Sequence, residues 1–447
     1  MRNLVIHFCV GIFALTISAC ATHKAVDKPL SSLPADSAQQ FTKQIVGNRS
    51  TELLVMVAFS GGGTRAAAFA YGVLQELADT KMKTGDGLQT LLQEVDMISS
   101  VSGGSFTNAY YGLYGDKIFK DFEERFLRKD VQGDLLWQIF RPINWIRLLS
   151  SAYGKSDIAA KYYDKILFND ATFADLYRPT APLTIINSTD LGTGMRISFT
   201  NPAFNLLCAD LDQYPISRAV TASSAVPGLF STITIKNYGG KCGFEEPAWM
   251  KDAQQDVNTT IRKQDAQGLA GYLDSEKQPW LHLVDGGVSD NLGLRSFFNM
   301  IRMVNDPHKA FSNLGHADLR HILIISVDSH AKHKNKWSLK SGSPSLLEMI
   351  GSVSATQITR YSADTIELVH FSFDKWAKQI STPGQPVSVD FVEVNFNMVK
   401  DKNKRDYLNN IGTSFELDDE HVDRLIAAGR KVLRESPEFK AFMKRSP

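Results

Sequence analysis

Three short segments carry groups that suit acyl transfer, and the first holds a candidate nucleophile. The run Ser100-Val101-Ser102-Gly103-Gly104 flanks a serine with small residues two positions before and two positions after it. This spacing is typical of a nucleophile elbow, a tight strand-to-helix turn that exposes a serine hydroxyl. The first position is usually glycine, so Ser100 departs from the pattern while remaining small. Ser102 is the candidate nucleophile, and Gly104 lets strand and helix cross closely.

The second segment, Ser60-Gly61-Gly62-Gly63-Thr64-Arg65, is rich in glycine and precedes an expected helix. Consecutive glycines at a helix start leave backbone N–H groups free to converge on an anion. In acyl transfer that anion is the tetrahedral oxyanion. A nucleotide phosphate loop would need Gly-Lys-Ser/Thr, which this segment lacks. The amides of Gly61, Gly62 and Gly63 are therefore candidate oxyanion donors.

The third segment is Asp285-Gly286-Gly287. An aspartate at a strand end can accept the serine proton or orient a histidine, although Asp-Gly is also a common turn pair. A triad in the order Ser, Asp, His needs a histidine after Asp285, yet none lies in a recognisable strand-end loop. The histidines after this point are His308, His316, His321, His330, His333, His370 and His421. Their spacing does not favour a metal site either.

The elements that must position these segments follow from apolar runs. Residues 53–59 form a continuous apolar run, as expected of a strand buried on both faces, and a helix is expected over 64–77. Short strands at 95–99 and 280–284 precede Ser102 and Asp285. Further strands are expected at 183–187, 195–199, 321–327 and 387–394, and helices at 343–370 and 421–433. This alternation predicts an α/β fold with a largely parallel sheet, whose carboxyl ends would carry all three segments.

The three segments, in this order, resemble the patatin-like phospholipase family. Between them, Ala222-Ser223-Ser224-Ala225-Val226-Pro227-Gly228 resembles that family's Ala-Ser-x-Ala-x-Pro segment, and the likeness covers roughly residues 53–294. The resemblance implies a three-layer α/β sandwich and a Ser-Asp dyad that works without histidine. Carried onto this chain, it makes Ser102 the nucleophile and Asp285 its general base.

The resemblance also implies roles for residues around this dyad. Gly61 to Gly63 would form the oxyanion hole, and no metal or organic cofactor is implied. Arg65 is expected to brace the glycine loop rather than meet an anionic substrate. The supporting residues would be Arg65, Gly104, Gly286 and Gly287.

The N-terminus has the features of an exported lipoprotein. Arg2 precedes an apolar run over 4–17 that is too short to span a bilayer comfortably, which favours a signal peptide. The run ends in Ile17-Ser18-Ala19-Cys20, which resembles a bacterial lipobox with Cys20 as the lipidated residue. The expected divisions are a signal peptide (1–19), a lipidated N-terminus and flexible tether (20–48), a patatin-like hydrolase domain (49–335) and a C-terminal α/β extension (336–447).

Composition and cysteine use are consistent with export. After loss of the signal and lipidation of Cys20, only Cys208 and Cys242 remain, either as one disulfide or as two buried thiols. The net charge of +1 gives no electrostatic footprint for nucleic acid. We expect an outer-membrane lipoprotein that faces the periplasm, because alanine rather than aspartate follows Cys20. The sequence names no protein partner.

An apolar stretch that contains Trp137 and Trp145 could have any of three structural roles. Arg141 and Arg147 interleave with it, which suits a membrane interface or a lid over the site. Buried helix packing is the ordinary alternative and is favoured here.

The function expected from these observations is a serine esterase that hydrolyses phospholipids, lysophospholipids or related lipids of a membrane through an acyl-enzyme. Two alternatives remain. One is another serine hydrolase, a thioesterase or peptidase with a histidine-containing triad. The other is an inactive lipoprotein that serves as a scaffold.

Overall fold

The computed structural model describes residues 25–35, 37–84, 87–148, 150, 153–258, 260–304, 306–331 and 341–445. The expected signal peptide and Cys20 lie outside the described residues. Among the described residues, no helix is both long and apolar enough to cross a bilayer.

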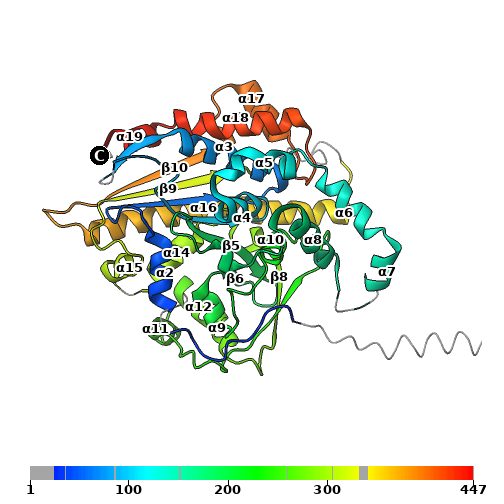
Figure 1. Cartoon of the computed structure of the whole chain (residues 1–447), viewed down its shortest axis with the longest axis horizontal. Coiled ribbons are helices and arrows are strands. Elements are labelled where there is room, and N and C mark those ends of the chain that lie inside the picture. Colours follow the sequence, from blue (N-terminus) through cyan, green and yellow to red (C-terminus); the bar gives the residue numbers. More distant parts are fainter. Residues whose placement is uncertain are drawn as a thin grey trace, which may run out of the picture.

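A central mixed sheet forms the middle layer, and its order is β10-β9-β1-β4-β5-β8-β7, with β6 also paired to β5 (Figure 1). The first five strands in this order run parallel, while β6, β8 and β7 are joined by antiparallel pairing. A separate antiparallel pair is formed by β2 (Lys81–Thr84) and β3 (Gly87–Thr90). The strands of the main sheet are β1 (Leu53–Phe59), β4 (Val95–Val101), β5 (Leu183–Asp190), β6 (Arg196–Phe199), β7 (Ile233–Lys236), β8 (Trp280–Asp285), β9 (His321–Asp328) and β10 (Ser388–Asn395).

Helices cover both faces of this sheet, and β1 shows why. Its residues alternate between two apolar cores: Leu53, Val55, Val57 and Phe59 enter one, while Leu54, Met56 and Ala58 enter the other. A strand buried on both faces reads as the continuous apolar run seen in the sequence. The expected three-layer α/β architecture with a largely parallel sheet is confirmed.

The two helical layers are built from different parts of the chain. One layer includes α3 (Gly63–Asp79), α4 (Gly103–Tyr114), α5 (Ile118–Phe122), α8 (Lys155–Tyr163), α10 (Ile216–Ser223), α18 (Asp419–Glu435) and α19 (Pro437–Arg445). The other includes α2 (Ser37–Val46), α14 (Arg295–Arg302), α15 (Pro307–Asn313) and α16 (Leu346–Ile380). The remaining helices are α6 (Val131–Ile139), α7 (Pro142–Leu148), α9 (Asn201–Leu206), α11 (Ala248–Gln254), α12 (Ile261–Ala270), α13 (Gly287–Asp290) and α17 (Lys402–Asn410).

The C-terminal segment is built onto the same sheet. Strand β10 pairs in parallel with β9 along its whole length, and α18 packs against α3 in the layer above (Figure 1). Residues 341–445 therefore add an edge strand and helices to the sheet that carries Ser102.

Residues 25–35 and 37–48 differ from the flexible tether expected there. Asp27 is buried and accepts a hydrogen bond from the Lys236 amide at 3.1 Å, and the Leu30 amide donates to the Cys208 carbonyl at 2.8 Å. Residues 37–46 form α2, which buries Ile45 in the second core. The helix carries only three large apolar residues, Phe41, Ile45 and Val46, which are too few to give a clear periodic signal, so this docking was not visible in the sequence.

The stretch that contains Trp137 and Trp145 also departs from expectation. Both side chains are exposed, at 62% and 56%, so the favoured reading of buried helix packing is wrong. They lie on α6 and α7, which extend from the side of the molecule in Figure 1.

Candidate active site

Ser102 lies at the turn between β4 and α4, with backbone angles φ 49° and ψ −121°. Positive φ is uncommon for a residue with a side chain and marks local strain of the kind found at functional sites. The Ser102 amide donates to the Ser223 hydroxyl at 2.8 Å, and that hydroxyl donates to the Asn187 carbonyl at 2.6 Å. The turn is therefore held from α10 and β5 as well as by its own chain.

Asp285 reaches Ser102 through an arrangement that differs from the expected one. The sequence suggested that Asp285 ends a parallel strand, but β8 is antiparallel to β5. Asn187 of β5 pairs with Val101 of β4, and the next residue, Ser188, pairs with Asp285. Both Asn187 and Ser188 also pair with β6, which occupies the opposite edge of β5. Strands β4 and β8 therefore share one edge of β5 and meet end to end.

This end-to-end junction brings the candidate nucleophile Ser102 and the Asp285 carboxylate together. The Ser102 hydroxyl donates a side-chain hydrogen bond to the Asp285 carboxylate, and the Gly287 amide donates to Asp285 Oδ1 at 2.8 Å. Ser102 and Asp285 are only 5% and 8% exposed. Burial raises the pKa of Asp285 to about 6, while the hydrogen bonds from Gly287 and Ser102 lower it. A carboxylate with that pKa is a better base near neutral pH than an ordinary aspartate.

The segment at residues 222–228 fastens both sides of the junction. In addition to the Ser223 contacts with Ser102 and Asn187, the Ser223 carbonyl accepts from the Gly286 amide at 3.1 Å. The Asp285 amide donates to the Ala225 carbonyl at 3.0 Å. A Cβ atom at Gly286 would lie 2.4 Å from the Asn187 carbonyl oxygen, so the close approach requires glycine there.

The glycine loop lies against the elbow. A Cβ atom at Gly103 would be 2.0 Å from the Gly63 carbonyl oxygen, so the first residues of α3 and α4 almost touch. The positive ends of these two helices consequently face the region of Ser102. The Gly61 amide donates to the Asn291 carbonyl at 3.1 Å. Of the three glycine amides, only those of Gly62 and Gly63 lack an acceptor among the residues that the structure describes.

Arg65 supports this loop from behind. Its side chain is 3% exposed, and Nη1 donates to the Ile411 carbonyl at 2.7 Å. Nearby, the Ser414 carbonyl accepts from the Thr64 amide at 2.9 Å. Burial lowers the pKa of Arg65 to about 10, which leaves the guanidinium charged at neutral pH. The contacts of Arg65 and Thr64 therefore connect the start of α3 to residues 411–414.

Several contributors to the site were missed in the sequence. Ser329 follows β9, and its hydroxyl donates to the Gly61 carbonyl at 3.1 Å. Asn187 donates from Nδ2 to the Ser99 hydroxyl and the Ser100 carbonyl at 2.9 and 3.0 Å. An asparagine inside a strand that is buried along its whole length was the one available signal, because a buried amide needs specific partners. Ser414 carried no signal, since it lies more than 300 residues from the loop.

No histidine takes part in the junction among the described residues. The groups that interact with the Asp285 carboxyl are the Gly287 amide and the Ser102 hydroxyl, and neither Asp285 nor Ser102 contacts an imidazole in this part of the chain. His333 lies outside the described residues. The same described ranges contain no cluster of His, Cys, Asp and Glu that could hold a metal ion.

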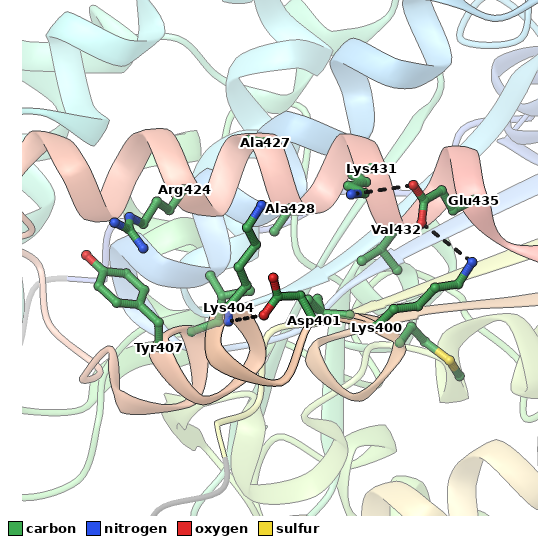
Figure 2. Close-up of a pocket in the computed structure, with 13 residues that line it drawn as sticks. Lys400, Asp401, Lys404, Tyr407, Arg424, Ala427, Ala428, Lys431, Val432 and Glu435 are labelled. Atoms are coloured by element: carbon green, nitrogen blue, oxygen red, sulfur yellow. Dashed lines mark hydrogen bonds and ion pairs between the residues drawn. The ribbon is translucent and has the colours of Figure 1, made fainter.

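Two sizeable cavities lie elsewhere. One, of about 650 Å³, lies between α17 and α18 and is shown in Figure 2. Its lysines Lys400 and Lys431 both pair with Glu435. The other, of about 760 Å³, is lined by residues that include Met195, Arg196 and Trp249. Neither cavity includes Ser102 or Asp285.

Cys208 and Cys242, which the sequence left as either a disulfide or two thiols, form a disulfide with Cα atoms 5.5 Å apart.

Comparison with known proteins identifies the class. Residues 57–298 match the family model described as Patatin-like phospholipase, which is more than half of the chain. The chain belongs to the patatin-like phospholipase family, a class of lipid hydrolases. A search of curated protein sequences gave no match.

A search of solved structures also found similarity to one human enzyme. The chain is similar to human GIVD cytosolic phospholipase A2, with 14% identity, a TM-score of 0.46, and coverage of 95% of this chain and 68% of that chain. A complex of that enzyme with methyl gamma-linolenyl fluorophosphonate and terbium chloride gives 14% identity and a TM-score of 0.43, over 95% of this chain and 66% of that chain.

Proposed function

We propose that the chain is a serine acyl-hydrolase that cleaves carboxylic ester bonds of phospholipids, lysophospholipids or related lipids. The observation that carries the proposal is the hydrogen bond between the Ser102 hydroxyl and the buried Asp285 carboxylate, at a junction beside two helix N-termini. Family membership supports the lipid class of substrate.

The first half of the reaction forms an acyl-enzyme. Ser102 Oγ attacks the ester carbonyl carbon while Asp285 accepts the hydroxyl proton. The carbonyl oxygen becomes an oxyanion, and the amides of Gly62 and Gly63 are the donors available to it. Because Gly61 already donates to Asn291, we narrow the proposed oxyanion hole to the two later glycines. The tetrahedral intermediate then collapses, and the leaving alcohol takes the proton from Asp285.

The second half releases the product. Water attacks the acyl carbonyl carbon and gives its proton to Asp285. Collapse of the second intermediate breaks the bond to Ser102 Oγ, which regains a proton from Asp285, and frees a carboxylic acid. Ser102 and Asp285 therefore return to their starting states without a cofactor.

The test is labelling and turnover of the purified protein on lipid esters. A fluorophosphonate should label wild type and should not label Ser102→Ala, and the variant should remain folded with turnover reduced by roughly 10⁴-fold or more. Retained turnover would refute the assignment, and absence of labelling in wild type would favour a scaffold. Replacing each histidine after Asp285 in turn should leave turnover intact, whereas loss with any one would favour a triad.

We also propose that Cys20 carries lipid and holds the protein at the outer membrane, facing the periplasm. The support is the Ile17-Ser18-Ala19-Cys20 segment and the Cys208–Cys242 disulfide, which suits an oxidising compartment. Cys20→Ala should move the protein from the membrane fraction to the soluble fraction. Unchanged fractionation, or absence of incorporated lipid, would contradict the anchor.

A further inference from the structure

Five large apolar side chains remain exposed within ten residues that span the end of α6, the turn after it and the start of α7. We call this set the apolar patch: Leu136, Trp137, Phe140, Ile143 and Trp145, each at least 50% exposed. The other exposed apolar residues of the described chain are scattered along it. Single exposed apolar residues are ordinary, whereas a contiguous group on one feature marks an interaction surface. Both exposed tryptophans among the described residues belong to this patch.

The patch is presented by helices that are fixed to the body of the protein. On α6, Val131 and Leu135 lie one turn apart and are buried, so the opposite side faces outward. Asn144 ties the two helices together, since its Nδ2 donates to the Gln138 carbonyl at 2.7 Å. The exposure therefore belongs to a defined surface and is not the fraying of a terminus.

The same helices are connected to the proposed oxyanion loop. Gln132 of α6 accepts a hydrogen bond from the Ser414 hydroxyl at 3.1 Å, and the Ser414 carbonyl accepts from the Thr64 amide at 2.9 Å. One residue therefore links the start of α6 to the start of α3. The helix that carries the first part of the patch and the glycine loop at residues 60–65 therefore both contact Ser414.

The charges around the patch favour one kind of partner. Residues 135–156 contain Arg141, Arg147 and Lys155 and no acidic residue. Arg141 lies over the Trp137 ring, with its Cζ atom 4.9 Å from the ring centroid. Tryptophan and arginine together suit the headgroup level of a bilayer, where the ring is half solvated and the cation meets phosphate. A second copy of the chain would instead bring Arg141 and Arg147 against their own equivalents or against apolar residues.

We infer that the apolar patch docks the protein onto an anionic phospholipid bilayer and presents lipids to Ser102. The second part of this inference, the presentation of lipids to Ser102, rests on the proposed function. The docking itself can be measured without turnover.

The direct test uses full-length protein and vesicles of phosphatidylglycerol with brominated acyl chains. Bromine quenches tryptophan only at short range, so the fluorescence component contributed by Trp137 and Trp145 should be lost on binding. The variant Trp137→Phe/Trp145→Phe identifies that component, and an N-terminal lipid anchor alone would leave it unquenched. An unquenched component on vesicle-bound protein would overturn the inference.

A second measurement separates docking from catalysis. Trp137→Ser/Trp145→Ser should weaken vesicle partitioning and lower turnover on vesicle lipid by roughly tenfold or more, with turnover on a soluble short-chain ester unchanged. Leu88→Ser, at an equally exposed position on β3, is the matched control and should change neither. If wild type does not turn over the soluble ester, the proposed function is contradicted, whereas the docking is not. Wild-type dimers that dissociate in the variant, without quenching, would assign the patch to self-association.

A third measurement tests whether the charges of Arg141 and Arg147 contribute to vesicle binding. Arg141→Gln/Arg147→Gln should reduce binding to phosphatidylglycerol vesicles roughly fivefold per charge and leave binding to phosphatidylcholine vesicles unchanged. Equal loss on both vesicle types, or no loss on either, would contradict the choice of an anionic surface.

Discussion

The junction of β4 with β8 and the apolar patch on α6 and α7 depart from an ordinary globular protein in opposite directions. The junction buries polar groups, including a carboxylate whose pKa is raised to about 6. The patch exposes apolar groups that a soluble protein normally covers. Both arrangements cost free energy in the isolated protein. The proposed catalysis would account for the first, and the proposed docking on lipid would account for the second.

This difference separates two kinds of sensitivity. Changes at the junction should affect every substrate alike, because they alter the reacting groups themselves. Changes in the patch should affect only substrates held in a bilayer, because a soluble ester reaches Ser102 without docking.

Asp285→Asn should lower turnover on soluble and vesicle substrates equally, by roughly 10⁴-fold.

The same Asp285→Asn change should increase the free energy of unfolding at pH 7. Because burial raises the pKa of Asp285, the native state binds more protons than the unfolded state between about pH 4 and 6, and stability falls as pH rises through that window. Removing the charge should recover about 1 to 3 kcal/mol in urea unfolding at pH 7. Asp116→Asn, at an exposed position, is the control. Loss of stability in Asp285→Asn would contradict this account.

Gly62→Ala should reduce kcat by roughly 100-fold on both kinds of substrate with little change in KM. Gly62 has φ +141°, and an added Cβ would lie 2.7 Å from Ser329 Oγ, so the proposed donor must move. Gly194→Ala is the matched control, because Gly194 also has positive φ but open space around it. Equal effects from the two substitutions would mean that backbone strain, rather than the oxyanion, explains the loss.

The pH dependence of kcat/KM on a soluble ester should follow the ionisation of Asp285. The base must be deprotonated to accept the Ser102 proton, so the rate should fall about tenfold for each pH unit below about 6. Vesicle substrate should show the same midpoint, since the patch contains no group that titrates there. A value of kcat/KM that stays constant down to pH 5 would contradict the proposed role of Asp285 as the general base.

Phe140→Ser should lower turnover on anionic vesicles about fivefold and leave soluble turnover and the thermal midpoint unchanged. The side chain is 64% exposed, so its loss opens no cavity. Phe371→Ser on α16, which removes a side chain exposed to 70%, serves as the control. A fall in the thermal midpoint would show that Phe140 packs against the protein. Equal losses of turnover on vesicle and soluble substrates would contradict the expectation that the patch, unlike the junction, affects only vesicle substrate.

The sequence by itself determined the local chemistry. The small residues around Ser102, the successive glycines after residue 60 and the Asp-Gly-Gly segment each encode a backbone shape over a few residues, which nearby spacing is sufficient to specify. The two-sided burial of β1 also follows from the sequence, because a continuous apolar run fits only a strand covered on both faces.

Only the tertiary structure decided how these pieces meet. Strand direction depends on pairing between distant segments, so nothing near Asp285 revealed that β8 runs antiparallel and abuts β4. The commitment of the Gly61 amide to Asn291 arises from a contact across more than 200 residues. Apolar residues at helical spacing look the same in a core or on a surface, so the exposure of Trp137 and Trp145 depended on whether other elements cover them.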